Sequence, residues 1–222
     1  MDVRRGRKAT LETDQEATEA VVDRATNERE PVARVWRPHR QIAFGRRDAR
    51  SEGYERAREV AERRGFPTTS REVGGRAVAF TGQTVAFVHA LPVEDGRATI
   101  EERYDDATAL LQRALADLGV DARSGEPANS FCPGSHSLQA RGKLAGLAQR
   151  VRTDVAVVAG VVLTNDHNAV ADVLEPVYDC LGVAFDPTSV GSVAAAGGPN
   201  DPIAVADAIT QALESEHVTA EE

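Results

Sequence analysis

The spacing of hydrophobic and polar residues changes along the chain, and it predicts both helices and strands. Apolar residues recur three and four positions apart between Thr99 and Leu118, which predicts the longest helix. Shorter apolar runs bounded by glycine, proline or polar residues predict strands. The predicted helices are 14–29, 54–64, 99–118, 166–181 and 202–216, and the predicted strands are 31–36, 41–45, 68–71, 77–81, 83–91, a short one after Gly119, 137–140, 144–150 and 154–164.

These elements predict the fold class and a division of the chain. Strands and helices mix without regular βα alternation, so we expect an α+β fold with a mixed β-sheet packed with helices. The run 83–91 is strongly apolar and predicts a central strand. A length of 222 residues suits either one α/β domain or one main domain with a small appendage. We expect a polar N-terminal segment over 1–30, the main domain over 31–195, and a C-terminal helix with an acidic tail over 196–222.

Charge and composition exclude several classes of protein. A net charge of −9 disfavours a nucleic-acid partner, because phosphates repel an acidic surface. No stretch approaches the roughly 20 apolar residues that span a bilayer, and the basic N-terminus lacks the apolar run of a secretory signal. The two cysteines, Cys132 and Cys180, form no disulfide framework, and the five histidines lack metal-site spacing. We therefore expect a cytoplasmic protein with free thiols, no metal and no membrane partner.

Lysine is rare in this chain, and its two positions have different settings. Of the 26 basic residues, only Lys8 and Lys143 are lysines. Lys8 lies in a charged N-terminal tail, whereas Lys143 lies in the apolar stretch 142–146. An ammonium is a compact charge with three donors, which a planar guanidinium does not reproduce. Lys143 is thus either tolerated by chance or required for a specific role.

Two loops contain residues suited to chemistry. The pair Gly74-Gly75 lies between two predicted strands, where glycine permits either a tight turn or the close approach of a ligand. In the loop 130–135, proline and glycine follow Cys132 and predict a turn that presents the sulfur at a strand end. A thiolate needs a nearby cation or N–H groups, and Lys143 follows across a predicted hairpin. The alternative for Cys132 is a small buried apolar residue.

The remaining candidates are weaker. Cys180 lies in an apolar helical stretch, 177–183, which predicts core packing. His136 is near enough in sequence to serve Cys132 as a base, although a plain loop histidine is the simpler interpretation.

The chain contains two motifs, Arg-x-x-Gly-Gly-x-Ala-Val at 71–78 and Gly-Lys-x-x-Gly-x-x-Gln-Arg at 142–150. In their spacing and order they resemble the lipoate–protein ligase and octanoyltransferase family. The segment 130–135 is similar to that of the lipoyl amidotransferases, which move octanoyl groups from the glycine cleavage H protein onto other lipoyl domains. The resemblance runs from about Val32 to Val193 and implies that 31–195 is a biotin/lipoate-ligase-like catalytic domain.

The resemblance also implies roles for individual residues. Cys132 would become acylated, and Lys143 would contact the acyl carbonyl and the incoming lysine amide. The implied substrate-binding residues are Arg71, Gly74, Gly75, Arg76, Ala77, Gly142, Ala145 and Gly146. Two positions depart from the family pattern: the stretch 83–87 lacks an asparagine, and Ser137 stands near the place of an amidotransferase aspartate.

The function implied in this way is acyl transfer. The expected enzyme moves an octanoyl or lipoyl group through a Cys132 thioester onto a lysine of a lipoyl domain, with lipoyl-domain or glycine cleavage H proteins as partners and no cofactor. One alternative is an ATP-dependent lipoate–protein ligase, in which Lys143 holds the adenylate and no cysteine is needed. A second alternative is a non-catalytic subunit that binds lipoyl domains.

Overall fold

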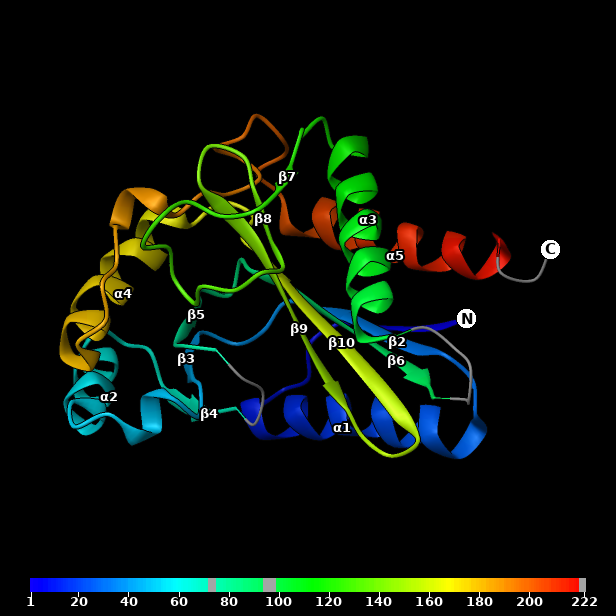
Figure 1. Cartoon of the computed structure of the whole chain (residues 1–222), viewed down its shortest axis with the longest axis horizontal. Coiled ribbons are helices and arrows are strands. Elements are labelled where there is room, and N and C mark those ends of the chain that lie inside the picture. Colours follow the sequence, from blue (N-terminus) through cyan, green and yellow to red (C-terminus); the bar gives the residue numbers. More distant parts are fainter. Residues whose placement is uncertain (72–74, 94–98, 220–222) are drawn as a thin grey trace.

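The chain folds into two β-sheets with helices packed around them (Figure 1). The computed structural model describes residues 1–71, 75–93 and 99–219. The helices are α1 (Leu11–Glu28), α2 (Tyr54–Arg63), α3 (Ile100–Asp117), α4 (His167–Leu181) and α5 (Pro202–Thr219). The strands are β1 (Asp2–Arg5), β2 (Val32–Trp36), β3 (Gln41–Phe44), β4 (Thr68–Ser70), β5 (Val78–Phe80), β6 (Val85–Pro92), β7 (Arg123–Ser124), β8 (Ser137–Gln139), β9 (Lys143–Val151) and β10 (Val155–Val162). None of these helices combines the length and apolar character needed to cross a membrane.

The larger sheet has seven strands in the order β1-β2-β6-β10-β9-β8-β7. β1 runs parallel to β2, and the other neighbouring strands are antiparallel, so the sheet is mixed as the sequence predicts. β6 and β10 pair over their full length, from Val85 opposite Val162 to Pro92 opposite Val155. The strand predicted at 83–91 is therefore an interior strand.

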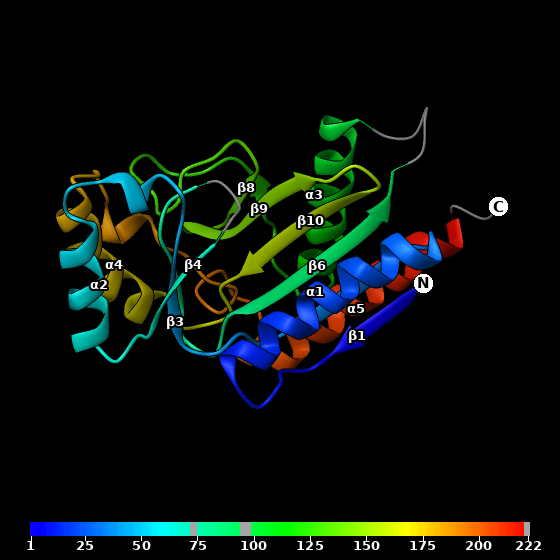
Figure 2. The same cartoon turned by 90° about the horizontal axis from the view of Figure 1, so that it is seen from below.

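Helices cover both faces of this sheet (Figure 2). Successive side chains of a strand point to opposite faces, so β2 directs Ala33 and Val35 toward α3 and α5 and Val32 toward α1. The predicted helix at 99–118 is confirmed, because α3 buries apolar residues at helical spacing and Thr99 caps its first turn with Glu102.

The smaller sheet, in the order β4-β3-β5, forms a second unit with α2 and α4 (Figure 1). β5 alternates like any strand, and it directs Ala79 into the apolar cluster shared with these two helices. The segment just before β5 carries Arg76 and Ala77 of the first motif. The small sheet therefore places Arg76 and Ala77 beside the loop that joins β7 to β8, which contains Cys132.

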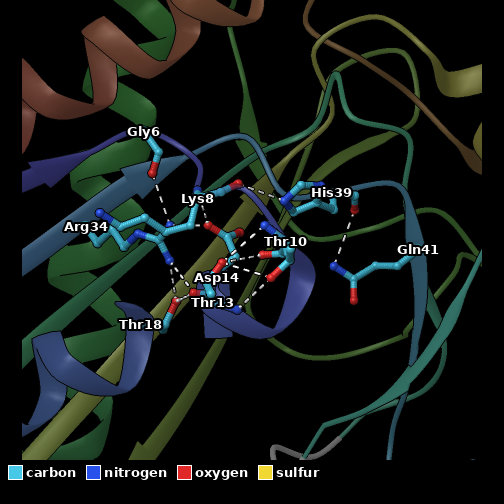
Figure 3. A network of polar contacts seen from close by, with 9 residues as sticks. All are labelled: Gly6, Lys8, Thr10, Thr13, Asp14, Thr18, Arg34, His39 and Gln41. Carbon is cyan, nitrogen blue, oxygen red and sulfur yellow. Dashed lines mark hydrogen bonds and ion pairs between the residues drawn. The ribbon is translucent and has the colours of Figure 1, made fainter. Parts of the chain in front are cut away.

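A buried ion pair fastens the N-terminal segment to the large sheet (Figure 3). The Arg34 guanidinium on β2 pairs with the Asp14 carboxylate on α1, and their side chains are only 2% and 8% exposed. Arg34 also donates to the carbonyl of Gly6 at 3.1 Å and to the Thr18 hydroxyl at 2.6 Å. Arg34 thus binds α1 and the β1–α1 connection to β2, and we call this ion pair with its hydrogen bonds the N-terminal clasp.

The structure differs from the sequence prediction at the N-terminus. The sequence predicts a charged tail around Lys8, but 2–5 form strand β1, because parallel pairing with β2 satisfies their backbone groups. α1 begins at Leu11, three residues before its prediction, where Thr10 and Thr13 form a capping box. The predicted mixed sheet is present, and a smaller three-stranded sheet accompanies it. The division at 30 and 195 stays a prediction.

Candidate active site

The loop between β7 and β8 reaches from the large sheet to β5 and α4 and carries Cys132 (Figure 1). Cys132 has φ +41°, in the left-handed region that non-glycine residues rarely occupy. Its N–H donates to the Tyr178 hydroxyl at 2.6 Å, and its carbonyl accepts from the Lys143 ammonium at 2.9 Å. The backbone of Cys132 is thus held on both sides by side chains distant in sequence.

The sulfur of Cys132 is surrounded by donors from the first motif. An Arg71 guanidinium nitrogen lies 3.2 Å from the sulfur, and the Arg76 backbone N–H donates to it at 3.4 Å. The same Arg71 nitrogen donates to the Arg76 carbonyl at 2.6 Å, which fixes its direction. A cation and an N–H group are the surroundings that stabilise a thiolate. The sequence suggests Lys143 as the cation beside the sulfur, but the structure places Arg71 there.

Gly75 allows this close approach. It has φ +100°, and a Cβ at this position would lie 2.7 Å from the Cys132 sulfur and 3.0 Å from the Arg71 guanidinium. A side chain would thus displace the sulfur from its donors. Gly74 lies outside the described residues.

Lys143, at the start of β9, is 1% exposed and donates to three oxygens. They are a Glu126 carboxylate oxygen at 2.7 Å and the carbonyls of Phe131 and Cys132 at 3.0 and 2.9 Å. An ammonium has three N–H donors, so all of them are in use. Lys143 thus lies beside Cys132, as the sequence suggests, but it holds the backbone of the loop.

Glu126 is the counter-charge of Lys143. Burial raises the pKa of this carboxyl, but the hydrogen bond and charge of Lys143, with hydrogen bonds from Ser137 and Gly134, together hold that pKa below its ordinary value. The Ser137 hydroxyl donates at 2.9 Å and the Gly134 N–H at 3.0 Å. Glu126 is therefore a carboxylate at neutral pH, and it neutralises the buried ammonium.

A second carboxylate positions the other side of the site. Asp48 is fully buried, and it pairs with the Arg76 guanidinium at 3.3 Å and accepts from the Gly45 N–H at 3.0 Å. A Cβ at Gly45 would lie 2.1 Å from the Gly75 carbonyl oxygen, so only glycine permits this contact. Asp48 and Gly45 thus fix the segment that presents the Arg76 N–H to the sulfur.

The other residues of the two motifs contact mainly the protein itself. Ala77 is buried, and its carbonyl accepts from the Tyr178 hydroxyl at 3.0 Å. Gly142 has φ +110°, and a Cβ there would lie 2.7 Å from the Gly191 nitrogen. Ala145 belongs to the core beneath α3, and a Cβ at Gly146 would lie 3.6 Å from the Lys143 side chain. Their predicted role in substrate binding stays a prediction.

The weaker candidates lie apart from the sulfur. The His136 ring stacks on Tyr104, with centroids 3.5 Å apart, and within the described residues no hydrogen bond links it to the Cys132 sulfur. Cys180 packs against the apolar cluster of α2 and α4. Among the described residues, no group of three or more histidine, cysteine, aspartate or glutamate side chains is placed to hold a metal ion.

Sequence reasoning missed Glu126, Asp48 and Tyr178. Glu126 carried a weak signal, because it is the acidic residue in the same loop as Cys132. Asp48 and Tyr178 lie 28 and 101 residues from their partners Arg76 and Ala77, so nothing local indicated them. A buried tyrosine hydroxyl usually has a hydrogen-bond partner, so the position of Tyr178 in an apolar helical stretch is a weak signal of such a contact.

The chain matches a known family over most of its length. The family described as "Lipoyl protein ligase A/B catalytic domain" matches residues 11–215. The chain belongs to this family. The resemblance carried by the two motifs is thereby confirmed, and the matched residues begin at α1 and include every strand except β1.

Two curated relatives of this chain are named as acyltransferases. An octanoyl-[GcvH]:protein N-octanoyltransferase of Exiguobacterium sp. is 33% identical over 165 residues, which cover 73% of this chain and 59% of that protein. A lipoyl-[GcvH]:protein N-lipoyltransferase of Listeria monocytogenes is 24% identical over 155 residues, which cover 69% of this chain and 56% of that protein. The chain thus spans between about half and three fifths of the length of these relatives.

A solved structure confirms the fold of this lipoyl protein ligase A/B domain. Lipoate-protein ligase A bound with ATP superposes with a TM-score of 0.75 at 18% identity, over 97% of this chain and 85% of that chain. At that identity the likeness concerns the fold alone. The predicted α+β fold of the lipoate-ligase type is therefore correct.

Proposed function

We propose that the chain is an acyltransferase that moves an octanoyl or lipoyl group onto a lysine of a lipoyl domain through a thioester on Cys132. One observation carries the proposal: the sulfur of Cys132 lies against the Arg71 guanidinium and the Arg76 N–H, in a loop that a buried Lys143 holds. The names of the relatives support the choice of acyl group and of GcvH as a partner. Free thiols persist in the cytoplasm, where we place the reaction.

The first step forms the thioester. The Cys132 thiolate attacks the carbonyl carbon of the acyl-lysine on the donor protein, so a C–S bond forms and the C–N bond breaks. The proton that the thiol gives up ends on the departing lysine amine. Arg71 and the Arg76 N–H lower the cost of forming the thiolate, because each donates directly to the sulfur.

Lys143 is the group best placed to stabilise the oxygen that becomes negative. Its three N–H donors are held by Glu126 and two loop carbonyls, so the acyl oxygen takes the place of one of these carbonyls in the proposed reaction. A donor aimed at such an oxygen contributes about 3 kcal/mol to the lowering of the barrier. Glu126 keeps the ammonium in place throughout.

The second step transfers the acyl group to the acceptor. The neutral amine of the acceptor lysine attacks the thioester carbonyl, so the C–N bond of the new amide forms as the C–S bond breaks, and the proton that the amine gives up ends on the departing sulfur. One amide replaces another, so the sequence of steps needs no ATP.

Val78 and Phe80 lie on the side of β5 opposite to Ala79, and this face is apolar enough to accept an acyl chain.

Intact-mass measurement tests the proposal. After incubation with octanoylated GcvH and no ATP, we expect the wild-type chain to gain one octanoyl group that hydroxylamine removes. Cys132→Ala should gain none, whereas Cys180→Ala is the matched control and should gain it fully. Acyl label that persists on Cys132→Ala contradicts the proposal. Pyrophosphate exchange that needs lipoate and ATP and survives Cys132→Ala would instead support the ligase.

A further inference from the structure

Tyr178 is fully buried between two segments of the site, the loop of Cys132 and the segment that contains Arg76 and Ala77. It lies on α4, it is 0% exposed, and its ring packs on Phe185 with centroids 5.1 Å apart. Burial raises the pKa of the Tyr178 hydroxyl far above its ordinary value. The hydroxyl therefore keeps its proton at neutral pH.

The hydrogen bonds of this hydroxyl have only one arrangement. A backbone N–H can only donate, so the N–H of Cys132 donates to the Tyr178 oxygen at 2.6 Å. The single hydroxyl proton then goes to the Ala77 carbonyl at 3.0 Å. Ala77 directly follows Arg76, whose N–H donates to the Cys132 sulfur. One hydroxyl thus joins the two segments that meet at the sulfur.

The conformation of Cys132 needs such support. A cysteine at φ +41° is strained, and strained backbone persists only where its surroundings hold it from several sides. Its carbonyl is held by Lys143, and its N–H is held by Tyr178. With both groups held, only rotation about the Cα–Cβ bond is left to aim the sulfur.

We infer that Tyr178 is a positioning residue, which holds the backbone of Cys132 so that its sulfur stays against Arg71 and the Arg76 N–H. The inference rests on the proposed function, because it gives Tyr178 a task in the Cys132 site. Removal of the hydroxyl leaves the Cys132 N–H and the Ala77 carbonyl without their partner. The loop then relaxes toward negative φ, and the sulfur moves away from its donors.

Alkylation of the thiol tests this inference without any acyl substrate. The rate at which iodoacetamide modifies Cys132 is measured against pH in Tyr178→Phe and in the wild type, by mass spectrometry of the peptides. Tyr54→Phe is the matched control, because its hydroxyl contacts the Ser70 side chain at the surface. Cys180 in the same chain is the internal reference.

We expect the alkylation rate of Cys132 at neutral pH to fall about tenfold in Tyr178→Phe, which corresponds to the loss of one buried hydrogen bond. The pH profile should move to higher pH, because the thiolate loses its donors. Tyr54→Phe and the Cys180 reference should stay unchanged. In acyl transfer, kcat should fall by a similar factor while KM for the donor stays constant, since the binding surface is intact.

An unchanged Cys132 pH profile in folded Tyr178→Phe overturns the inference, even if acyl transfer through Cys132 is demonstrated. A shifted profile in a chain that never takes an acyl group removes the proposed function and leaves the positioning role standing. Should Tyr178→Phe fail to fold, amide hydrogen exchange in the wild-type chain decides the question. The Cys132 amide should exchange slowly, and exchange as fast as that of an exposed amide overturns the inference.

Discussion

Two buried cations lie in different regions of the molecule, Arg34 in the N-terminal clasp and Lys143 in the candidate active site. Their exposed fractions are 2% and 1%. Each pairs with one carboxylate, Asp14 or Glu126, and each donates to backbone carbonyls as well. By charge and burial alone, the two sites are alike.

The difference lies in what each cation holds. The partners of Arg34 belong to α1 and its preceding loop, and the Asp14 side chain is only 8% exposed. Lys143 instead holds the strained loop of Cys132, and the Glu126 side chain is 20% exposed. In the proposed function, the buried charge of Arg34 therefore serves stability, because it joins elements, and that of Lys143 serves chemistry, because it holds the loop of Cys132. Variants at the two sites should separate these effects.

The largest effect should come from Arg34→Met. Loss of the cation leaves the buried Asp14 carboxylate without its counter-charge, so the free energy of unfolding should fall by about 3–5 kcal/mol. Denaturant unfolding measures this loss, while acyl transfer per folded molecule should stay unchanged. The double variant Arg34→Met/Asp14→Leu should recover most of the lost stability, because no charge is left buried. A loss below about 1 kcal/mol would contradict the role of this clasp.

Lys143→Arg should have the opposite effect, a loss of acyl transfer rather than of stability. Acyl transfer should fall about 100-fold, because the planar guanidinium does not reproduce three donors from one compact atom. Single-turnover transfer from octanoylated GcvH measures the rate, and Arg34→Lys is the matched control, which should retain it. Full activity of Lys143→Arg would remove the catalytic role and favour a module that only binds lipoyl domains.

Gly75→Ala should have a smaller effect, at the sulfur and its Arg71 donor. The new methyl group would lie 2.7 Å from the Cys132 sulfur at a backbone φ of +100°, so the sulfur must move. We expect transfer and thiol alkylation each to fall about tenfold, which equals about 1.4 kcal/mol. Gly134→Ala is the control, because a Cβ there meets no atom within 4 Å. Equal losses in both variants would show that the close contact at Gly75 has no special role.

Glu126→Gln should have the smallest effect, and pH should reveal it. The amide keeps an oxygen acceptor for Lys143, so transfer at neutral pH should fall only about threefold, as for a partly exposed ion pair. The folded state lowers the pKa of Glu126, so its contribution to stability is complete above the unfolded pKa and is lost as pH falls through the folded pKa. The unfolding temperatures of wild type and variant should therefore begin to converge as pH falls below about 4.3 and should meet below the folded pKa. A constant difference down to acidic pH contradicts this assignment.

Most elements of the fold follow from local patterns. The predicted helix 99–118 and the predicted strands 83–91 and 154–164 correspond to α3, β6 and β10 with boundaries shifted by one or two residues. Periodicity and capping are local signals, so the sequence contains them in full. β1 has no such signal, because its charged residues form a strand only by pairing with β2.

The chain by itself determined the fold class, the family and the two residues, Cys132 and Lys143, on which the proposed chemistry rests. Tertiary structure alone decided the contacts between them. It placed Arg71 rather than Lys143 against the sulfur, and it brought Tyr178 to the backbone of Cys132. The physical reason is that hydrogen bonds and ion pairs depend on separation in space, and here their partners stand 46 and 61 residues apart along the chain.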